Sequence, residues 1–256
     1  MPSRHSRARY GQRALVERTA QAILHSAFTQ QDIAFIGERD FFFLSSVDPD
    51  GHPTVSYKGG APGFVKVENG ELVLPCYDGN GIFLSIGNIA ADPKIGLLFM
   101  DFERPRRLRV QGLARLDESA ARDAIPGALF LVRVAPLHIF VNCPRYVHKY
   151  TRAETSKYVP DEDGSAPLAQ WKRLQIVHDS LSPVDQAAAE SAGFISLEEY
   201  EAKVEAGDVD CGPHVCCWPL EMLLLEAKNV RSCITEVVFA DDAVACSGSN
   251  PDRSAS

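Results

Sequence analysis

The sequence lacks any apolar stretch that approaches the ~20 residues needed for a membrane-spanning helix. It also lacks a continuous apolar segment behind the arginines of its N-terminus, so it carries no recognisable secretory signal. These two absences argue against a membrane protein and against an exported one. We therefore expect a soluble, cytoplasmic protein that does not bind membranes.

The sequence has fewer basic than acidic residues, with 26 Lys and Arg against 34 Asp and Glu, and its net charge is -8. A phosphate-binding face normally makes a domain basic, so nucleic acid is not expected as a partner. The seven cysteines are odd in number and unevenly spaced, in a chain far longer than the small secreted domains that depend on disulfides. Reduced thiols are therefore expected.

The stretch from Asp40 to Leu116 is rich in strand and turn signals and organises the chain. An apolar run at 41–47 meets an Asp-Pro-Asp-Gly turn, and the β-branched and aromatic residues of 53–58 return from it. The glycine pair Gly59 and Gly60 then allows close approach of a backbone or a ligand. Strands at 63–67 and 71–75 flank Asn69-Gly70, a strong hairpin signal.

A glycine-rich loop at 77–81 leads into a predicted helix from Ile82 to Ala91, which Pro93 prevents from continuing. A helix N-terminus offers unpaired N–H groups and a positive dipole end. This loop therefore favours an anion such as a phosphate.

Two further strands are predicted at 94–102 and 107–116, and the second alternates polar with apolar residues. Arg107 and Arg109 therefore share a face. They could meet an anionic ligand, or they could belong to a solvated face with cross-strand carboxylates such as Asp101 and Glu103. Spacing alone favours the solvated face.

Helices are predicted on both sides of these strands. An amphipathic helix is expected at 13–25, and Thr29 with Asp32 predicts the start of a short helix that ends at Gly37. Two strands at 129–134 and 138–142 complete the sheet. Ser182 and Ser196 are candidate N-caps for helices at 183–192 and 197–206.

Cys143 and the cysteines near Cys211 are candidate functional sites, and neither is assigned a function. Cys143 has basic neighbours that could lower its pKa, but a small buried hydrophobe is the commoner role. Cys211, His214, Cys216 and Cys217 are residue types that suit zinc, yet no second ligand pair is evident. We assign no metal site, and we expect residues 241–256 to be a flexible tail.

Phe41 to Leu116 resembles the FMN-binding split β-barrel of the pyridoxamine 5′-phosphate oxidase-like family. The resemblance rests on the order of several short motifs, which are residues 42–44, 48–51, 53–60, 78–81, 92–93, 96–99, 106–112 and 142–146. It implies a mainly β (α+β) fold with a six-stranded split barrel, a homodimer with the flavin near the subunit interface, and FMN as cofactor. The barrel would occupy about 40–150 within a domain at 1–150, with a helical extension at 151–256 packed on it.

The resemblance also implies cofactor contacts. Lys58 ends the strand whose lysine lies near the flavin ring in the oxidase, and Ser56 and Tyr57 would flank it. Pro75 and Cys76 occupy the place of a cofactor-touching pair that is often Tyr-Thr. Arg107 stands where the oxidase has a glutamine that contacts FMN.

The phosphate contacts depart from the family pattern. The oxidase has an adjacent Arg-Lys pair, which the loop at 78–85 lacks. We expect Asn80, Ser85 and Asn88, with helix N-terminal amides and Arg107 or Arg109, to hold the phosphate instead.

The implied function is an oxidoreductase that transfers hydride or electrons through the flavin to an unknown small substrate. Vitamin B6 oxidation is not supported, because the C-terminal Arg-x-His substrate pattern of the oxidase is missing. No catalytic residue is assigned. Two alternatives stay open: a flavin-binding, storage or stress-related protein without turnover, and a relative that binds haem or a deazaflavin.

Overall fold

The structure is a computed structural model that describes residues 23–79, 81–117 and 125–206. The helix expected at 13–25 lies almost wholly outside these ranges, and so do the cluster around Cys211 and the tail at 241–256. The chain divides into two compact units, 1–202 and 203–256, and the described residues comprise most of the first unit and residues 203–206 of the second.

The first described helix, α3 (Gln30–Gly37), begins as its cap predicts. Asp32 N–H donates to Thr29 Oγ1 at 3.2 Å, and Thr29 N–H donates to Asp32 Oδ2 at 2.8 Å. This reciprocal pair is a capping box, which satisfies two N–H groups at the helix start. The local prediction is therefore confirmed.

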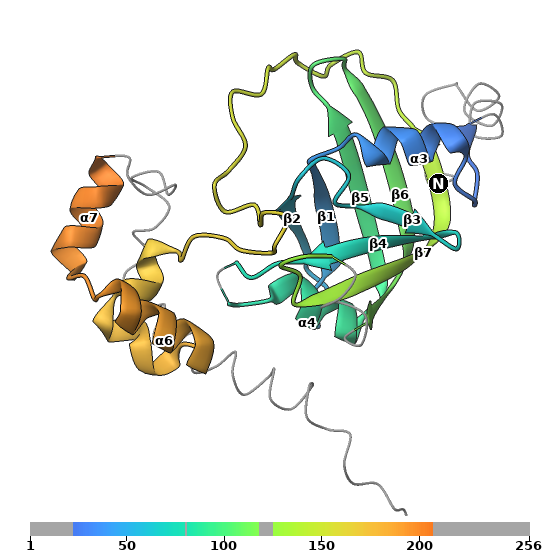
Figure 1. The fold of residues 1–256 in the computed structure, drawn as a ribbon. Helices are drawn as coiled ribbons and strands as arrows, with labels where there is room; N and C mark the ends of the chain where they lie inside the picture. The colour runs from blue at the N-terminus through green and yellow to red at the C-terminus, as the bar shows by residue number, and fades with distance from the viewer. Residues whose placement is uncertain (1–22, 80, 118–124, 207–256) are drawn as a thin grey trace, which may run out of the picture. The chain divides into compact units, whose positions relative to one another are not determined.

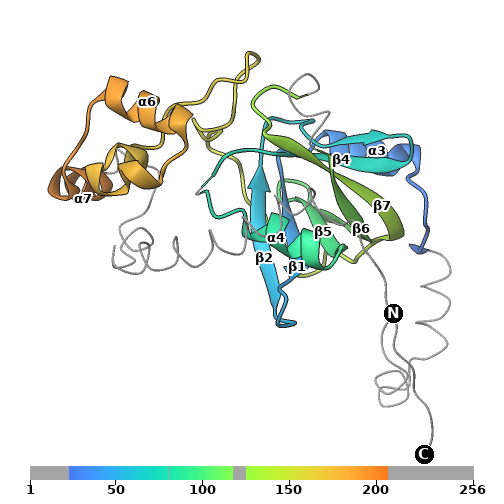
Figure 2. The same cartoon turned by 90° about the horizontal axis from the view of Figure 1, so that it is seen from below.

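Seven antiparallel strands follow: β1 (Phe41–Val47), β2 (Pro53–Gly59), β3 (Lys66–Glu68), β4 (Glu71–Cys76), β5 (Lys94–Asp101), β6 (Arg106–Asp117) and β7 (Phe130–Val141). They form one sheet in the order β2-β1-β5-β6-β7-β4-β3. Asn69 and Gly70 join β3 to β4 with φ of 52° and 81°, as an Asn-Gly hairpin turn requires. Helix α4 (Leu84–Ala91) lies between β4 and β5 in the chain and beside β1 (Figure 2).

Two strand predictions need correction. The sheet has seven strands rather than six, and the residues predicted as two strands at 129–134 and 138–142 form the single strand β7 (Phe130–Val141). Gln111 pairs with His138 while Gly112 pairs with Pro136, so Leu137 is an extra residue in a β-bulge. A bulge lets one strand bend without ending, and Pro136 therefore does not divide β7.

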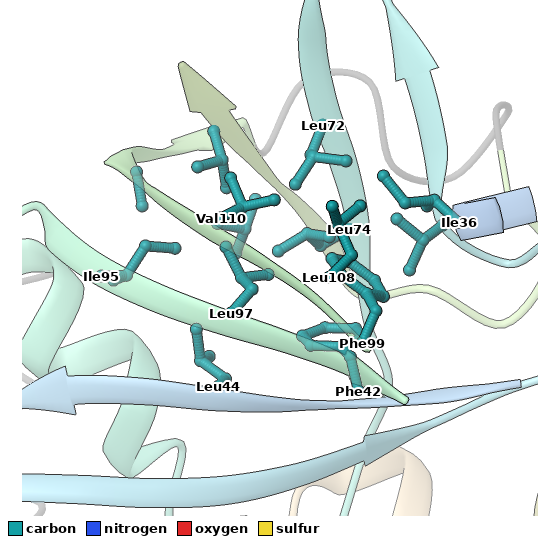
Figure 3. Close-up of a cluster of buried hydrophobic side chains, with 14 of the residues drawn as sticks. Ile36, Phe42, Leu44, Leu72, Leu74, Ile95, Leu97, Phe99, Leu108 and Val110 are labelled. Carbon is teal, nitrogen blue, oxygen red and sulfur yellow. The ribbon is translucent and has the colours of Figure 1, made fainter. Parts of the chain in front are cut away.

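The sheet curls (Figure 1) and encloses the larger of two clusters of buried apolar side chains. In Figure 3, Leu72 and Leu74 of β4 point toward Leu108 and Val110 of β6, and Ile36 of α3 lies beside them. Phe99 of β5 is fully buried in this cluster. Phe42 of β1 and Leu72 of β4 belong to the same cluster although their strands lie near opposite ends of the sheet order, which is what the split barrel requires.

Residues 142–169 after β7 contain no helix or strand, and four helical segments follow them. These segments are η1 (Gln170–Arg173), η2 (Gln175–Ser180), α6 (Pro183–Ala192) and α7 (Leu197–Glu205). Asp185 N–H donates to Ser182 Oγ at 3.2 Å and Glu199 N–H donates to Ser196 Oγ at 3.1 Å, so both predicted caps are confirmed. No helix in the described ranges is long and apolar enough to cross a membrane.

The packing at the bulge can be tested with a matched pair of glycine substitutions. A Cβ at Gly112 would lie 2.6 Å from both Ala135 O and Val134 Cγ1, whereas a Cβ at Gly87 in α4 would meet nothing within 4 Å. Gly112→Ala should lower the free energy of unfolding by about 1–3 kcal/mol through overpacking. Gly87→Ala should raise it by about 0.5–1 kcal/mol through helix propensity. Urea unfolding measures both, and equal effects would contradict the packing at the bulge.

Candidate functional site

One face of β2 carries a row of three polar side chains, Thr54, Ser56 and Lys58. The cross-strand partners of Ser56 and Lys58 are Leu44 and Phe42, whose side chains lie in the core. Because directly opposite residues share a face, this row points to the core side of the sheet. We call the contact between the row, α4 and the end of β4 the polar seam.

Hydrogen bonds in the polar seam hold α4 against β1 and β2. Asn88 Nδ2 donates to Ser46 Oγ at 3.0 Å and to Thr54 Oγ1 at 3.3 Å, and the two hydroxyls lie 3.0 Å apart. Ser56 and Ser85 share a hydrogen bond of 2.8 Å between their hydroxyls. Ser46, Ser85 and Asn88 are buried. Their polar groups therefore act inside the protein, and Ser85 and Asn88 use hydrogen bonds there that the sequence assigned to a phosphate.

Lys58 differs from the rest of the polar seam. It is half-buried and has no hydrogen-bond or ion-pair partner among the described residues. Its charge acts on the buried thiol of Cys76, which ends β4. Burial raises the pKa of this thiol to about 11, and Lys58 opposes the shift, so Cys76 is a protonated thiol at neutral pH.

Pro75 and Tyr57 are placed differently from Lys58. Pro75 is buried in β4, where it pairs with Leu131. Tyr57 lies on the opposite face of β2 from Lys58, and its ring stacks on Phe41 with centroids 5.4 Å apart. The three consecutive residues 56–58 thus do not act on one ligand from one face.

Arg107 and Arg109 lie on the outer face of β6, as the alternation predicts, while Leu108 and Val110 between and beside them are buried. Arg107 Nη2 donates to the carbonyl oxygen of Cys143 at 2.8 Å. Arg107 Nε is buried without a hydrogen-bond partner. Within one chain, both arginines are on the opposite face of the sheet from Lys58.

The loop before α4 and the start of this helix form the region where an anion site is predicted. Asn80 lies outside the described residues. Phe83 precedes the helix in the left-handed region, with φ of 51°, and no side chain caps the first turn of α4. Because Phe83 itself supplies no side-chain acceptor at the N-cap, the positive end of the helix can interact with an anion.

The glycine pair after Lys58 has a packing role. A Cβ at Gly60 would lie 2.4 Å from Cδ2 of Phe64, whose ring belongs to the core. Glycine is therefore required at this position to make room for Phe64 rather than for a ligand.

Lys172 is a buried residue that the sequence analysis missed. Its ammonium contacts the carboxylate of Asp78 in the loop after β4, and that of Asp185 at 2.8 Å. Burial would lower the pKa of Lys172, but the hydrogen bonds to Asp185 and Asp78 outweigh it and raise the pKa. No local signal marks this contact, because Lys172 and Asp78 are 94 residues apart.

The polar seam makes a prediction about stability. Asn88→Ala removes both donors to Ser46 and Thr54, and it should lower the free energy of unfolding by about 1–3 kcal/mol. Lys94→Ala is the control, since it removes only an exposed ion pair with Asp92, for which a change of about 0–1 kcal/mol is expected. Chemical denaturation measures both, and an Asn88→Ala protein as stable as the control would contradict the seam.

Comparison with known proteins identifies the barrel. Residues 28–129 match the family model described as pyridoxamine 5′-phosphate oxidase. A comparison with curated proteins found no match.

Similar solved structures include three bacterial proteins. HupZ from Group A Streptococcus is 16% identical, with 48% of this chain and 99% of that chain covered and a TM-score of 0.37. The heme storage protein HutZ from Vibrio cholerae is 18% identical, with 42% and 89% covered and a TM-score of 0.34. General Stress Protein 26 from Bacillus anthracis is 19% identical, with 43% and 91% covered and a TM-score of 0.33. The matched residues run from just before α3 to just before β7, so this part of the chain, which is less than half of its length, is similar to the pyridoxamine 5′-phosphate oxidase family.

Proposed function

We propose that this chain binds FMN and works as a flavin-dependent oxidoreductase on a small molecule. The observation that carries the proposal is Lys58, a half-buried residue whose ammonium has no hydrogen-bond or ion-pair partner among the described residues. Removing a charge from water without a partner costs free energy, so such a lysine suits an anionic ligand. A cation beside the flavin ring would stabilise the negative charge of the reduced form, while the flavin itself would supply the hydride or electron transfer.

The start of α4 supports a place for the phosphate group. Its N-cap residue, Phe83, is in the αL conformation and makes no side-chain cap hydrogen bond. Backbone N–H groups at a helix N-terminus bind phosphate well. Because Ser85 and Asn88 are engaged with Ser56, Ser46 and Thr54, we assign the phosphate to backbone amides rather than to these side chains.

A homodimer is part of the proposal. Lys58 and Arg107 lie on opposite faces of the sheet in one chain, so one flat ligand cannot meet both side chains there. A ligand between two copies could meet Lys58 of one copy and Arg107 of the other. The buried, unpartnered Nε of Arg107 supports a role for this side chain beyond its bond to Cys143.

The described residues near Lys58 supply binding and electrostatics rather than acid–base chemistry. Cys76 holds its proton at neutral pH, and the carboxylate of Asp78 is bound to Lys172. We therefore propose that the chain binds and tunes the flavin, while protons exchange with water.

Lys58→Met tests the flavin site. It should raise the Kd for FMN by about tenfold to hundredfold, since a hydrogen bond to a charged group contributes about 1.5–3 kcal/mol. Lys66→Met is the matched control, because Lys66 is an exposed lysine on β3, and its Kd should be unchanged. Titration of FMN fluorescence measures both affinities. Equal Kd values in the wild type and in Lys58→Met would remove Lys58 from the site.

The same preparation tests turnover. Rapid reduction of the bound flavin by NADH or NADPH is the expected result. A bound flavin that no donor reduces would instead indicate a binding protein without turnover. A protein that takes up no FMN but gains a Soret band with haem would replace the flavin proposal altogether.

Subunit mixing tests the dimer. Lys58→Met and Arg107→Ala proteins should each bind FMN weakly when alone. If each site combines Lys58 of one copy with Arg107 of the other, a mixed dimer has one intact site and one doubly altered site. Unfolding and refolding the two proteins together should therefore restore tight sites, counted by FMN titration. Failure to restore any tight site, while each variant alone is weakened, would place both residues in the same copy or make one effect indirect.

A further inference from the structure

A groove of about 870 Å³ lies on the outer face of the sheet, away from the core-facing polar seam. Phe41, Phe43 and Tyr57 form its floor, and residues 150–159 after β7 form part of its wall. Arg152 Nη1 binds Asp40 Oδ2 at 2.6 Å, and the N–H of Tyr150 donates to the carbonyl of Phe102 at 3.2 Å. These two contacts hold the wall over the floor, and the volume suits an organic molecule of ordinary ligand size.

The groove is lined by a continuous set of aromatic rings. Tyr57 stacks on Phe41 at 5.4 Å with planes 12° apart, and Phe41 stacks on Phe102 at 5.8 Å with planes 9° apart. Tyr150 meets Phe102 edge to face at 5.4 Å. Tyr57 and Tyr150 are 63% and 61% exposed, so rings at both ends of the set are open to solvent. A flat ligand can stack on such a surface.

The charge of the groove is negative. Its described lining residues include six carboxylates and three arginines. Arg39 binds Asp101 at 3.1 Å and Arg152 binds Asp40, which neutralises two of the arginines.

Among the described lining residues, the carboxylates of Glu103 and Glu154 and the guanidinium of Arg104 have no side-chain partner, which leaves an excess of negative charge. Partial burial and the carboxylate of Asp40 raise the pKa of Tyr57, in agreement with a negative field at the floor. Such a field attracts cations and repels anions.

We propose that the groove is a binding site for a flat aromatic cation, of the size of a quaternary pyridinium or quinolinium ring. The aromatic faces and the surplus carboxylates both favour a delocalised positive charge. A ring that carries a carboxylate or phosphate is disfavoured by the same groups. The groove reaches Gly59 and Gly60, which follow Lys58, so its ligand would lie near the proposed flavin site without sharing its side chains.

Calorimetric titration of the full chain without FMN tests this site with N-methylquinolinium as the probe. Saturable binding with one site per chain is expected, and quinoline-2-carboxylate should bind at least about tenfold more weakly. Because the titration contains no FMN, its failure leaves the flavin proposal untouched. Equal affinity for the two probes, or no binding of the cation, would overturn the assignment.

Substitutions of groove residues test whether the probe binds in the groove. Tyr57→Leu should weaken binding by about tenfold, whereas Tyr57→Phe, which keeps the ring, should retain it. The double variant Glu103→Gln with Glu154→Gln should weaken binding by about threefold. Glu162→Gln is the control, since Glu162 is exposed and outside the groove. An unchanged affinity in Tyr57→Leu, or a Kd that rises with protein concentration because a second copy covers the groove, would contradict the proposal.

Discussion

The alternation of side chains along a strand is the constraint on which the site depends. Successive residues of a strand point to opposite faces, so Lys58 faces the core side of the sheet while Tyr57 faces outward. In β6 the same rule buries Leu108 and leaves Arg107 and Arg109 outside. Neighbours in the sequence are thereby assigned to two separate environments. The candidate residues divide between those two faces as a direct consequence.

On the core side, the side chains of the polar seam use their hydrogen bonds to hold α4 in position. Asn88 and Ser85 are buried in α4, and their bonds to β1 and β2 hold the helix against the sheet. A buried amide without such partners would be destabilising, and Ser46 and Thr54 supply the acceptors that the Asn88 amide needs. Lys58, at the end of the same row, is the member whose charge remains without a partner among the described residues. That contrast separates the fastening residues from the residue that we propose to contact a ligand.

The two faces also differ in charge. The polar seam offers an ammonium and an uncapped helix start, which suit an anion, while the outer groove combines exposed aromatic rings with surplus carboxylates. These opposite preferences lie close together, because the groove reaches the glycines that follow Lys58. Ion pairs such as Arg39 with Asp101 fix the groove, and Lys172 holds the loop after β4 through Asp78. Long-range contacts therefore shape both environments.

The sequence by itself determined the elements whose signals lie within a few residues: the Thr29 cap, the Asn69-Gly70 turn and the alternation of β6. It also indicated the family. It did not determine that β7 passes through Pro136, because the bulge depends on its register with β6. It likewise did not determine that Asn88 and Ser85 bond inward, or that Lys172 meets Asp78. The tertiary structure decided these contacts, since backbone dihedral preferences are local, whereas side-chain partners depend on strand register and on segments far apart in the chain.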